Sequence, residues 1–478
     1  MTLRRFAAAL LAAAAISAFC AAQEIPYPVY ETDKISPAEY RERRAKLKAQ
    51  LGSGALAVYF TNPHHIRNND VEFTFRADSG FLYLTGMEEP NAALILAPDG
   101  FDLNGKRVTE ALFCTVPNAG TLTWLGYFMG PLNATRLLGV EAALSHADFE
   151  KTLQAAASAA KAFGGRLSVG PMPVGPTGPL KRMVDAFEAW RSSAGFSNGL
   201  NVRNTVRTMR EIKSPAEIAL LKKAAEISAL AHVEAMRSIE PGMREWEIRA
   251  LVMYVFAKEG CEAPGYDPIV GSGPNSCILH YMSCRRQMLA GDIVCMDTAG
   301  EYHGYSADVT RSFPVSGKFS PEQRAIYEVV LAAQDAGIAL CKPGVTTREI
   351  GQKVSETLAA GLVRLGIIKS AAELGTYYMH GFGHGIGLDV HDPMPRTLAP
   401  GAVLTVEPGI YIKEGSPCDR KWWNIGIRIE DDIVVTESGP LNLSAGAPRS
   451  VAEIERLMAE KGLGNQPLRP WKPQPANR

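Results

Sequence analysis

The sequence predicts an α/β domain followed by an α+β domain that is built from two related halves. Its 478 residues are enough for two or three domains of roughly 100–200 residues each. Between residues 36 and 200, short apolar runs alternate with helical stretches, which is the pattern of an α/β domain. Between residues 214 and 460, similar segments occur twice, which indicates a duplicated half-domain with an internal pseudo-twofold.

The α/β domain is predicted to begin with a helix. Ser36 caps this helix, Pro37 takes its first position, and Glu39 stands where it can return a hydrogen bond to the cap. The apolar runs that follow predict strands at 54–60, 81–85, 92–97 and 111–116, and two later stretches predict helices at 151–163 and 180–190.

The repeat in the second domain is clearest in its helices. Residues 214–217 and 320–323 are both capping boxes, and each opens a long alanine-rich helix. Each helix is stopped by a Pro-Gly pair, at 241–242 and at 343–344. The same local signals in the same order predict two helical segments with the same place in each half.

The strands of the second domain repeat as well. Gly291 stands six residues before Asp297, and Gly401 stands six residues before Glu407, with apolar runs between. A pseudo-twofold would bring these two carboxylates, each at the end of a strand, together at the centre of the domain. Distant parts of the chain could then contribute to one site.

The first 22 residues differ from the rest and predict a secretory signal peptide. Arg4 and Arg5 form a positive start, residues 6–19 are apolar, and small residues precede a cleavage site after Ala22. A membrane anchor is the weaker alternative because the run is shorter than the ~20 residues a span needs. We therefore expect a periplasmic or secreted protein without a membrane anchor after cleavage, and a flexible tail at 464–478.

Charge and cysteine content narrow the function classes. The 50 lysines and arginines balance the 50 aspartates and glutamates, which gives no electrostatic case for nucleic acid or an anionic membrane. Of eight cysteines, Cys20 lies in the predicted leader, and the remaining seven contain no CxxC pair that would suggest a zinc knuckle. They are expected to be small buried side chains, with one disulfide left open by an oxidising compartment.

Four carboxylates and one imidazole carry the chemistry: Asp297, Asp308, His384, Glu407 and Glu430. Each lies after a strand-like run or in a glycine-rich stretch, where a buried charge is costly unless it meets a cation. An oxygen-rich set of this size suits two divalent metals about 3.5–4 Å apart, which together can activate water. The set predicts a dinuclear metallohydrolase.

Other polar residues lie near the candidate ligands in the sequence. Arg428 is two residues from Glu430 and therefore shares its strand face, where it can orient a ligand carboxylate. Asp431 and Asp432 are expected to be solvated at the strand end, and His303 is expected on the surface.

The remaining histidines cluster around glycines. His380 and His384 have the spacing of a zinc-protease helix, but they lack its glutamate and are separated by two glycines, so a loop is predicted. His391 follows this loop, and His280 lies in a polar stretch. One such histidine is usually structural, whereas three near a carboxylate set indicate a site.

Together these segments resemble the aminopeptidase P and prolidase branch of the metallopeptidases with the pita-bread (creatinase/aminopeptidase-like) fold. A stretch at 67–86 resembles the N-terminal domain of that family, and the resemblance extends from about residue 36 to 458. The segments that carry it in the second domain are 271–281, 296–314, 379–393, 405–411 and 426–436.

The resemblance implies a role for each candidate. Asp297 would bind one metal and His384 the other, Asp308 and Glu430 would bridge both, and Glu407 would complete the set and act as general base. The catalytic histidines would be His280, His380 and His391, which bind the substrate carbonyl and stabilise developing charge. Tyr411 and Arg428 would lie behind them.

The implied cofactors are two divalent ions, with Mn²⁺ the usual metal of the family, and self-association is implied as well. The implied reaction removes the N-terminal residue of peptides with proline second. A dipeptidase (prolidase) shares these motifs and stays open. A metal-free creatinase-like enzyme and a pita-bread binding module are disfavoured, because no ligand position is lost.

Overall fold

The computed structural model describes residues 25–466, and the chain divides into two compact units, Met1–Thr205 and Val206–Arg478. The predicted signal peptide and the predicted tail from residue 467 onward lie outside the described residues. The start of that tail is a short 3-10 helix, Leu463–Asn465, where the Asn465 side chain donates to the Ser238 carbonyl at 2.8 Å. No helix among residues 25–466 is long and apolar enough to cross a membrane.

The first unit is built on a six-stranded mixed sheet in the order β6-β5-β4-β1-β7-β8, with a separate β2-β3 hairpin. Its strands are β1 (Ala55–Phe60), β2 (Ile66–Asn68), β3 (Val71–Glu72), β4 (Ala93–Leu103), β5 (Lys106–Cys114), β6 (Ala143–Ser145), β7 (Arg166–Val169) and β8 (Ser197–Asn198). Its helices are α2 (Pro37–Leu51), α3 (Ser79–Thr85), α4 (Ala119–Leu125), α5 (Gly130–Leu138), η1 (His146–Asp148), α6 (Phe149–Lys161) and α7 (Gly178–Ser193); α8 (Val202–Met209) contains the boundary between the units.

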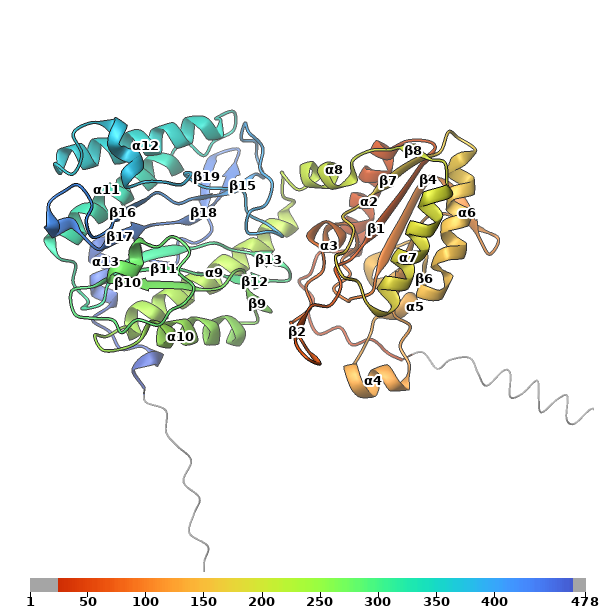
Figure 1. Cartoon of the computed structure of the whole chain (residues 1–478), viewed down its shortest axis with the longest axis horizontal. Helices are drawn as coiled ribbons and strands as arrows, with labels where there is room; N and C mark the ends of the chain where they lie inside the picture. The colour runs from red at the N-terminus through yellow and green to blue at the C-terminus, as the bar shows by residue number, and fades with distance from the viewer. Residues whose placement is uncertain (1–24, 467–478) are drawn as a thin grey trace, which may run out of the picture. The chain divides into compact units, whose positions relative to one another are not determined.

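Helices cover both faces of this sheet (Figure 1). α6 and α7 bury one face of the strands, and Leu56, Val58 and Phe60 of β1 belong to the cluster that packs there. On the other face the α2 residue Arg44 pairs with Glu110 of β5, at 2.9 Å, with both side chains buried. The α/β reading of this domain is confirmed.

The strand predicted at 81–85 is wrong, because this run forms the helix α3. Asp78 caps α3 by accepting from the Phe81 N–H at 2.9 Å, and Gly86 ends it in the left-handed conformation with φ 71°. Every residue from Gly80 to Thr85 is buried, and a short run that is apolar all round has no period that separates helix from strand. The helix predicted at Ser36 is present as α2.

The second unit contains the predicted repeat. Its helices are α9 (Pro215–Ser238), α10 (Glu245–Lys258), α11 (Pro321–Ile338), α12 (Thr347–Arg364), α13 (Val451–Leu457) and the short η2 (Gly273–Cys277), η3 (Ala371–Thr376), η4 (Arg420–Trp422) and η5 (Leu463–Asn465). Ser214 with Glu217, and Ser320 with Gln323, form both reciprocal bonds of a capping box, as predicted. Each long helix ends before its Pro-Gly pair and is followed by a second helix.

The strands of this unit form small antiparallel sheets, β10-β11-β14, β15-β18-β19, β13-β12-β9 and β16-β17. Their bounds are β9 (Ala263–Pro264), β10 (Ile269–Ser272), β11 (Ile293–Asp297), β12 (Gly300–Tyr302), β13 (Tyr305–Ser306), β14 (Thr310–Pro314), β15 (Val403–Val406), β16 (Gly409–Ile412), β17 (Ile425–Arg428), β18 (Asp431–Thr436) and β19 (Gly439–Asn442). In Figure 1 the helix pairs α9–α10 and α11–α12 lie on opposite sides of these strands.

The two halves meet where β14 lies beside the end of β17 and the residues that follow it. Thr310 forms an isolated bridge with Glu430, and Ser312 exchanges hydrogen bonds with the Arg428 backbone at 3.0 Å each. One apolar cluster with residues from α9 to α12 and from the strands fills the interior. The strand-end carboxylates therefore meet where the halves join, in the pita-bread arrangement.

The cysteines behave as predicted. All seven from Cys114 to Cys418 are unpaired, and six of them are buried.

Candidate metal centre

One pocket of about 650 Å³ in the second unit is lined by all the residues that were predicted as metal ligands or catalytic groups. The pocket is lined by His280, Asp297, Asp308, His380, His384, His391, Glu407, Arg428 and Glu430, together with Tyr266 and apolar side chains that include Ile269, Leu279, Met282 and Val390. Tyr411 lies behind the lining. The site is thus assembled from segments up to about 160 residues apart in the chain.

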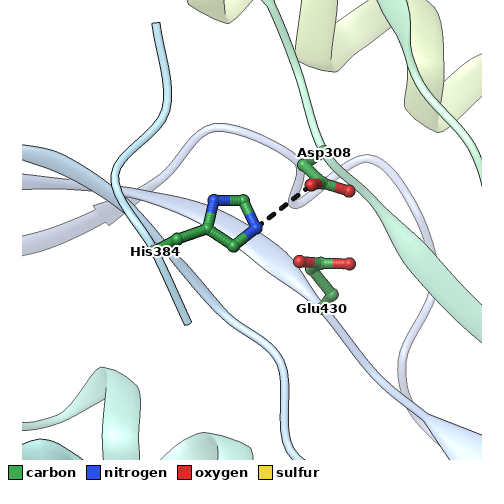
Figure 2. A group of neighbouring side chains, drawn as sticks. All are labelled: Asp308, His384 and Glu430. Carbon is green, nitrogen blue, oxygen red and sulfur yellow. Dashed lines mark ion pairs between the residues drawn. The ribbon is translucent and has the colours of Figure 1, made fainter. Parts of the chain in front are cut away.

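Asp308, His384 and Glu430 of this pocket lie together (Figure 2), and one ligand atom from each lies within 4.8 Å of the others. His384 Nε2 is 3.4 Å from Asp308 Oδ2. The backbone holds His384 in place, because its N–H donates to Thr405 Oγ1 at 3.1 Å and its carbonyl accepts from the Thr405 N–H at 2.8 Å. His384 Nδ1 faces the Gly385 carbonyl at 3.1 Å, which leaves Nε2 directed at the carboxylates.

Asp297 ends β11 beside this centre. Arg428 Nη2 donates to Asp297 Oδ2 at 2.6 Å. The Tyr266 hydroxyl lies within hydrogen-bond distance of both Asp297 and Asp308 Oδ1, 2.6 Å from the latter, and its one proton is shared between them. Tyr266 therefore holds two candidate ligands at a set separation. Sequence reasoning missed it, since a single tyrosine in a polar loop carries no distinguishing signal.

Glu407 and Glu430 complete the set. Glu407 lies 3.6 Å from His384 Nε2 and 3.6 Å from His380 Nδ1, while Glu430 accepts from Thr310 Oγ1 at 2.7 Å. Burial raises the pKa of Glu407 to about 7, although His384 and Arg428 oppose the shift. Burial, together with the charge of Asp308, raises the pKa of Glu430 well above its usual range.

These shifts describe a site with a surplus of negative charge. Burial raises the pKa of Asp297 even though Arg428 donates to it. A cluster of carboxylates that is unfavourable to ionise together becomes favourable when divalent cations take the place of protons. The donor set of four carboxylates and one imidazole fits two hard or borderline cations.

The histidines divide by environment. Burial by itself lowers the pKa of His384, but the hydrogen bond and charge of Asp308 outweigh it and raise this pKa to about 9. Burial and the Arg428 charge lower the pKa of His380 to about 4, so this ring is neutral. His380 Nε2 bonds to the Tyr411 hydroxyl at 2.8 Å, and that hydroxyl accepts from Arg428 Nη1 at 2.9 Å.

The expectation that Asp431 and Asp432 are solvated is wrong. Residues 431–435 of β18 are all buried, so side chains on both faces of this strand are covered by other parts of the unit. Asp431 pairs with the buried Arg311 at 2.7 Å, and Asp432 Oδ2 accepts from the Asp308 N–H at 3.1 Å. Both aspartates therefore support the segments that carry the candidate ligands.

The surface position expected for His303 is also wrong. Its side chain is buried, and Nδ1 lies 3.0 Å from Glu262 Oε1. His303 lies in the turn between β12 and β13 and has a positive φ of 48°. Glu262 also accepts a hydrogen bond from the His303 backbone N–H at 2.9 Å.

His232 in α9 supports the same region and makes stability depend on pH. Its Nε2 lies 3.2 Å from the Thr298 carbonyl and 3.0 Å from the Val309 carbonyl, next to Asp297 and Asp308, and its buried Nδ1 has no partner among residues 25–466. Burial and the Arg311 charge lower the pKa of His232 to about 3.

A histidine that is neutral when folded takes up a proton first in the unfolded chain. We expect the stability contributed by His232 to be complete above pH ~6.5 and to be lost toward pH ~3, by at most about 1.4 kcal/mol per pH unit. Urea unfolding of wild type and His232→Gln between pH 4 and 7 tests this, because the variant should show the shallower pH dependence. Equal slopes in the two proteins would contradict it.

Fold and site together define a metal-dependent peptidase. The family model for metallopeptidase family M24 matches residues 219–437, and the model for the N-terminal domain of aminopeptidase P matches residues 40–163. The chain belongs to metallopeptidase family M24 and is a hydrolase with the pita-bread fold. The resemblance found in the motifs is confirmed.

Relatives of known name cover nearly the whole chain. The Xaa-Pro aminopeptidases of Escherichia coli and Haemophilus influenzae are each 37% identical, over 89% of this chain and 98% of theirs. The structure of E. coli aminopeptidase P with the inhibitor Pro-Leu matches with a TM-score of 0.80 at 36% identity, over 89% of this chain and 99% of that one. Pseudomonas aeruginosa aminopeptidase PepP matches with a TM-score of 0.81 at 36% identity, over 90% and 99%.

Proposed function

We propose that this protein is an Xaa-Pro aminopeptidase that uses two divalent metal ions, most simply Mn²⁺, to release the N-terminal residue of peptides with proline second. The observation that carries the proposal is the single pocket in which Asp308, His384 and Glu430 converge, with Asp297 and Glu407 beside them. Relatives named Xaa-Pro aminopeptidase match almost end to end, which supports the substrate class.

Five residues of the pocket are candidate metal ligands. Asp308, Glu430, Asp297 and Glu407 would hold the two ions through carboxylate oxygens and His384 would hold them through an imidazole nitrogen. When bound, a metal pair polarises the scissile carbonyl and lowers the pKa of water. Tyr266 and Arg428 keep Asp297 in position by donating to its two oxygens.

Glu407 is the group that moves the proton. Its carboxylate lies in the pocket beside His384, 3.6 Å from Nε2, where it can take a proton from the attacking water and give it to the departing proline nitrogen. His280 and His391 line the same pocket and bind the substrate carbonyl, where they stabilise the charge that develops on its oxygen. Neutral His380, which bonds to Tyr411, supports them.

Proline at the second position has a physical reason. The bond before proline is a tertiary amide without the N–H that many peptidases bind, and it is conformationally restricted. A site that acts on the carbonyl through metal ions and histidines does not need that donor. An Xaa-Pro dipeptidase would use the same groups, so chain length is the property that separates the two activities.

The experiment is hydrolysis by the mature chain after chelation and readdition of Mn²⁺ or Zn²⁺. An Xaa-Pro dipeptide and an Xaa-Pro-Yaa-Yaa tetrapeptide are compared. We expect chelation to remove activity and added metal to restore it. We expect the tetrapeptide to release its N-terminal residue as a free amino acid. Cleavage of the dipeptide alone would make the protein a prolidase, and no metal-dependent cleavage of either peptide would overturn the proposal.

Export is proposed from the leader-like residues 1–22. Secretion to the periplasm or medium predicts a mature chain that begins at Gln23. N-terminal sequencing of protein recovered from these fractions tests this, and a chain that retains residues 1–22 would contradict it.

Self-association is proposed from the surface around α4. No residue of α4 is buried, Trp124 and Leu125 are 85% and 72% exposed, and residues 111–135 contain no charged side chain. An uncharged helix with exposed apolar side chains indicates a surface that another protein surface covers. Light scattering on wild type and Trp124→Glu tests this; we expect the variant to have the lower mass, and a monomeric wild type would contradict it.

A further inference from the structure

The pocket wall includes a loop that has little structure of its own. Residues 278–286 follow η2 and lead toward β11, the strand that ends at Asp297. They contribute His280 and Met282 to the pocket. Both side chains are exposed, and the loop between them and β11 contains no helix or strand. A catalytic histidine on such a loop needs an external support to hold its geometry.

We infer that Glu245 is the residue that positions this loop, and with it His280, for catalysis. The inference rests on the proposed function, since it assigns a supporting residue to the proposed peptidase site. Glu245 is the first residue of α10, it lies outside the pocket lining, and its side chain is fully buried.

The Glu245 carboxylate receives five hydrogen bonds. Oε1 accepts from the Ser272 N–H at 2.8 Å, from Ser272 Oγ at 2.7 Å and from Asn275 Nδ2 at 3.1 Å. Oε2 accepts from the Tyr281 hydroxyl at 2.9 Å and from the Arg286 N–H at 2.8 Å. One oxygen thus binds the start of the 272–286 segment and the other binds its far end.

Only an ionised carboxylate matches this arrangement. Its two oxygens accept without donating, whereas a glutamine would turn an N–H₂ group toward donors on one side. The position at the start of α10 also favours a negative charge, because the helix dipole places partial positive charge at this end of the helix. Charge-assisted hydrogen bonds are stronger than neutral ones. The two from Tyr281 and Arg286 therefore fix the loop, and the three from Ser272 and Asn275 fix the carboxylate on the segment that precedes it.

His280 lies between two anchored neighbours. On one side the Leu279 carbonyl accepts from Arg428 Nη2 at 3.4 Å, and Arg428 also binds Asp297. On the other side Tyr281 is tied to Glu245, and the Tyr281 hydroxyl accepts from the Arg285 N–H at 3.2 Å. The backbone at position 280 is therefore clamped between the metal centre and Glu245.

The experiment uses the metal-loaded full chain with Glu245→Gln and Tyr281→Phe. Both variants are expected to keep the metal content of wild type and to lose between ten- and a hundredfold in kcat on the tetrapeptide, roughly the effect of a displacement of about 1 Å, with a smaller change in KM. Amide hydrogen exchange in residues 278–286 is expected to be faster. If Glu245→Gln does not fold, Tyr281→Phe, which removes one hydroxyl from a half-buried side chain, carries the test.

The matched control is Glu247→Gln. Glu247 lies on the same turn of α10, is exposed, and accepts only from the nearby Arg244 N–H at 2.8 Å among the bonds described. The Glu247→Gln substitution removes one negative charge from the same turn, and the Glu247 side chain has no described bond to the loop. We therefore expect wild-type kcat and wild-type amide hydrogen exchange in residues 278–286.

Dependence on His280 separates positioning from general stability. In a His280→Ala background, Glu245→Gln should lower kcat less than about twofold further, because effects that act through one group do not add. An equal further loss, a loss of bound metal, or unchanged kcat in both variants would overturn the inference. If wild type cleaves no Xaa-Pro peptide, the proposed function fails, and unchanged exchange in residues 278–286 would then overturn the role of Glu245 independently.

Discussion

Asp308→Ala is expected to abolish peptide hydrolysis and to weaken metal binding by more than about 100-fold, beyond the 10–100-fold typical of residues that only support a ligand. The Asp308 carboxylate lies 3.4 Å from His384 Nε2 and 2.6 Å from the Tyr266 hydroxyl. Its loss therefore removes one of the three candidate ligands that lie together in the site. Metal content by mass spectrometry and turnover of the tetrapeptide measure both effects.

The fold should survive this change. The Asp308 carboxylate lies among other buried carboxylates, and removing it relieves their mutual repulsion. The control is Asp185→Ala in α7, where the exposed Asp185 pairs only with the exposed Lys181 among the ion pairs described, at 2.6 Å. This control should keep full metal content and activity. Full activity in Asp308→Ala would rule out the proposed centre.

Asp431→Ala is expected to destabilise the second unit by about 3–5 kcal/mol, because it leaves the charge of Arg311 buried without its partner. Arg311 and Asp431 are both fully buried and lie 2.7 Å apart. Asp431 also accepts from Ser444 Oγ at 2.6 Å and from Gln334 Nε2 at 3.0 Å. The same Gln334 amide donates to the Val406 carbonyl, which precedes Glu407.

Hydrogen exchange of the β14 and β18 amides measures this loss for the second unit alone, which matters because two-unit chains need not unfold in one step. Asp335→Ala is the control, since exposed Asp335 pairs with the partly exposed Arg449 at 2.9 Å. An exposed pair contributes at most about 1 kcal/mol. A loss below about 1 kcal/mol in Asp431→Ala would contradict the prediction.

Local signals in the sequence predicted the helix starts and the repeat correctly. The capping boxes at Ser214 and Ser320 involve residues three positions apart, so neighbours in sequence determine them. The strands that lead to Asp297 and Glu407 were predicted for the same reason, from apolar runs that end in a charge. The run at 81–85 was predicted wrongly because it is buried on all sides, where no period remains.

The chemical identity of the candidate site was readable as well. Carboxylates and histidines that are costly to bury stand out against apolar and glycine-rich surroundings, and the pocket contains all eight that were predicted, together with Arg428. Tyr266, Asp431 and Glu245 were not predicted to matter. Each is an ordinary polar residue in its local sequence, and its importance comes from partners far away in the chain.

The sequence by itself determined which residue types carry the chemistry, where the two long helices α9 and α11 begin, and that the unit is duplicated. Tertiary structure alone decided which carboxylates face the pocket and which lie beneath it. Glu430 and Asp431 are adjacent, yet one lines the pocket and the other pairs with Arg311 in the interior. The physical reason is that burial depends on what packs against both faces of a strand, and those neighbours come from segments distant in the sequence, such as Arg311 and Gln334.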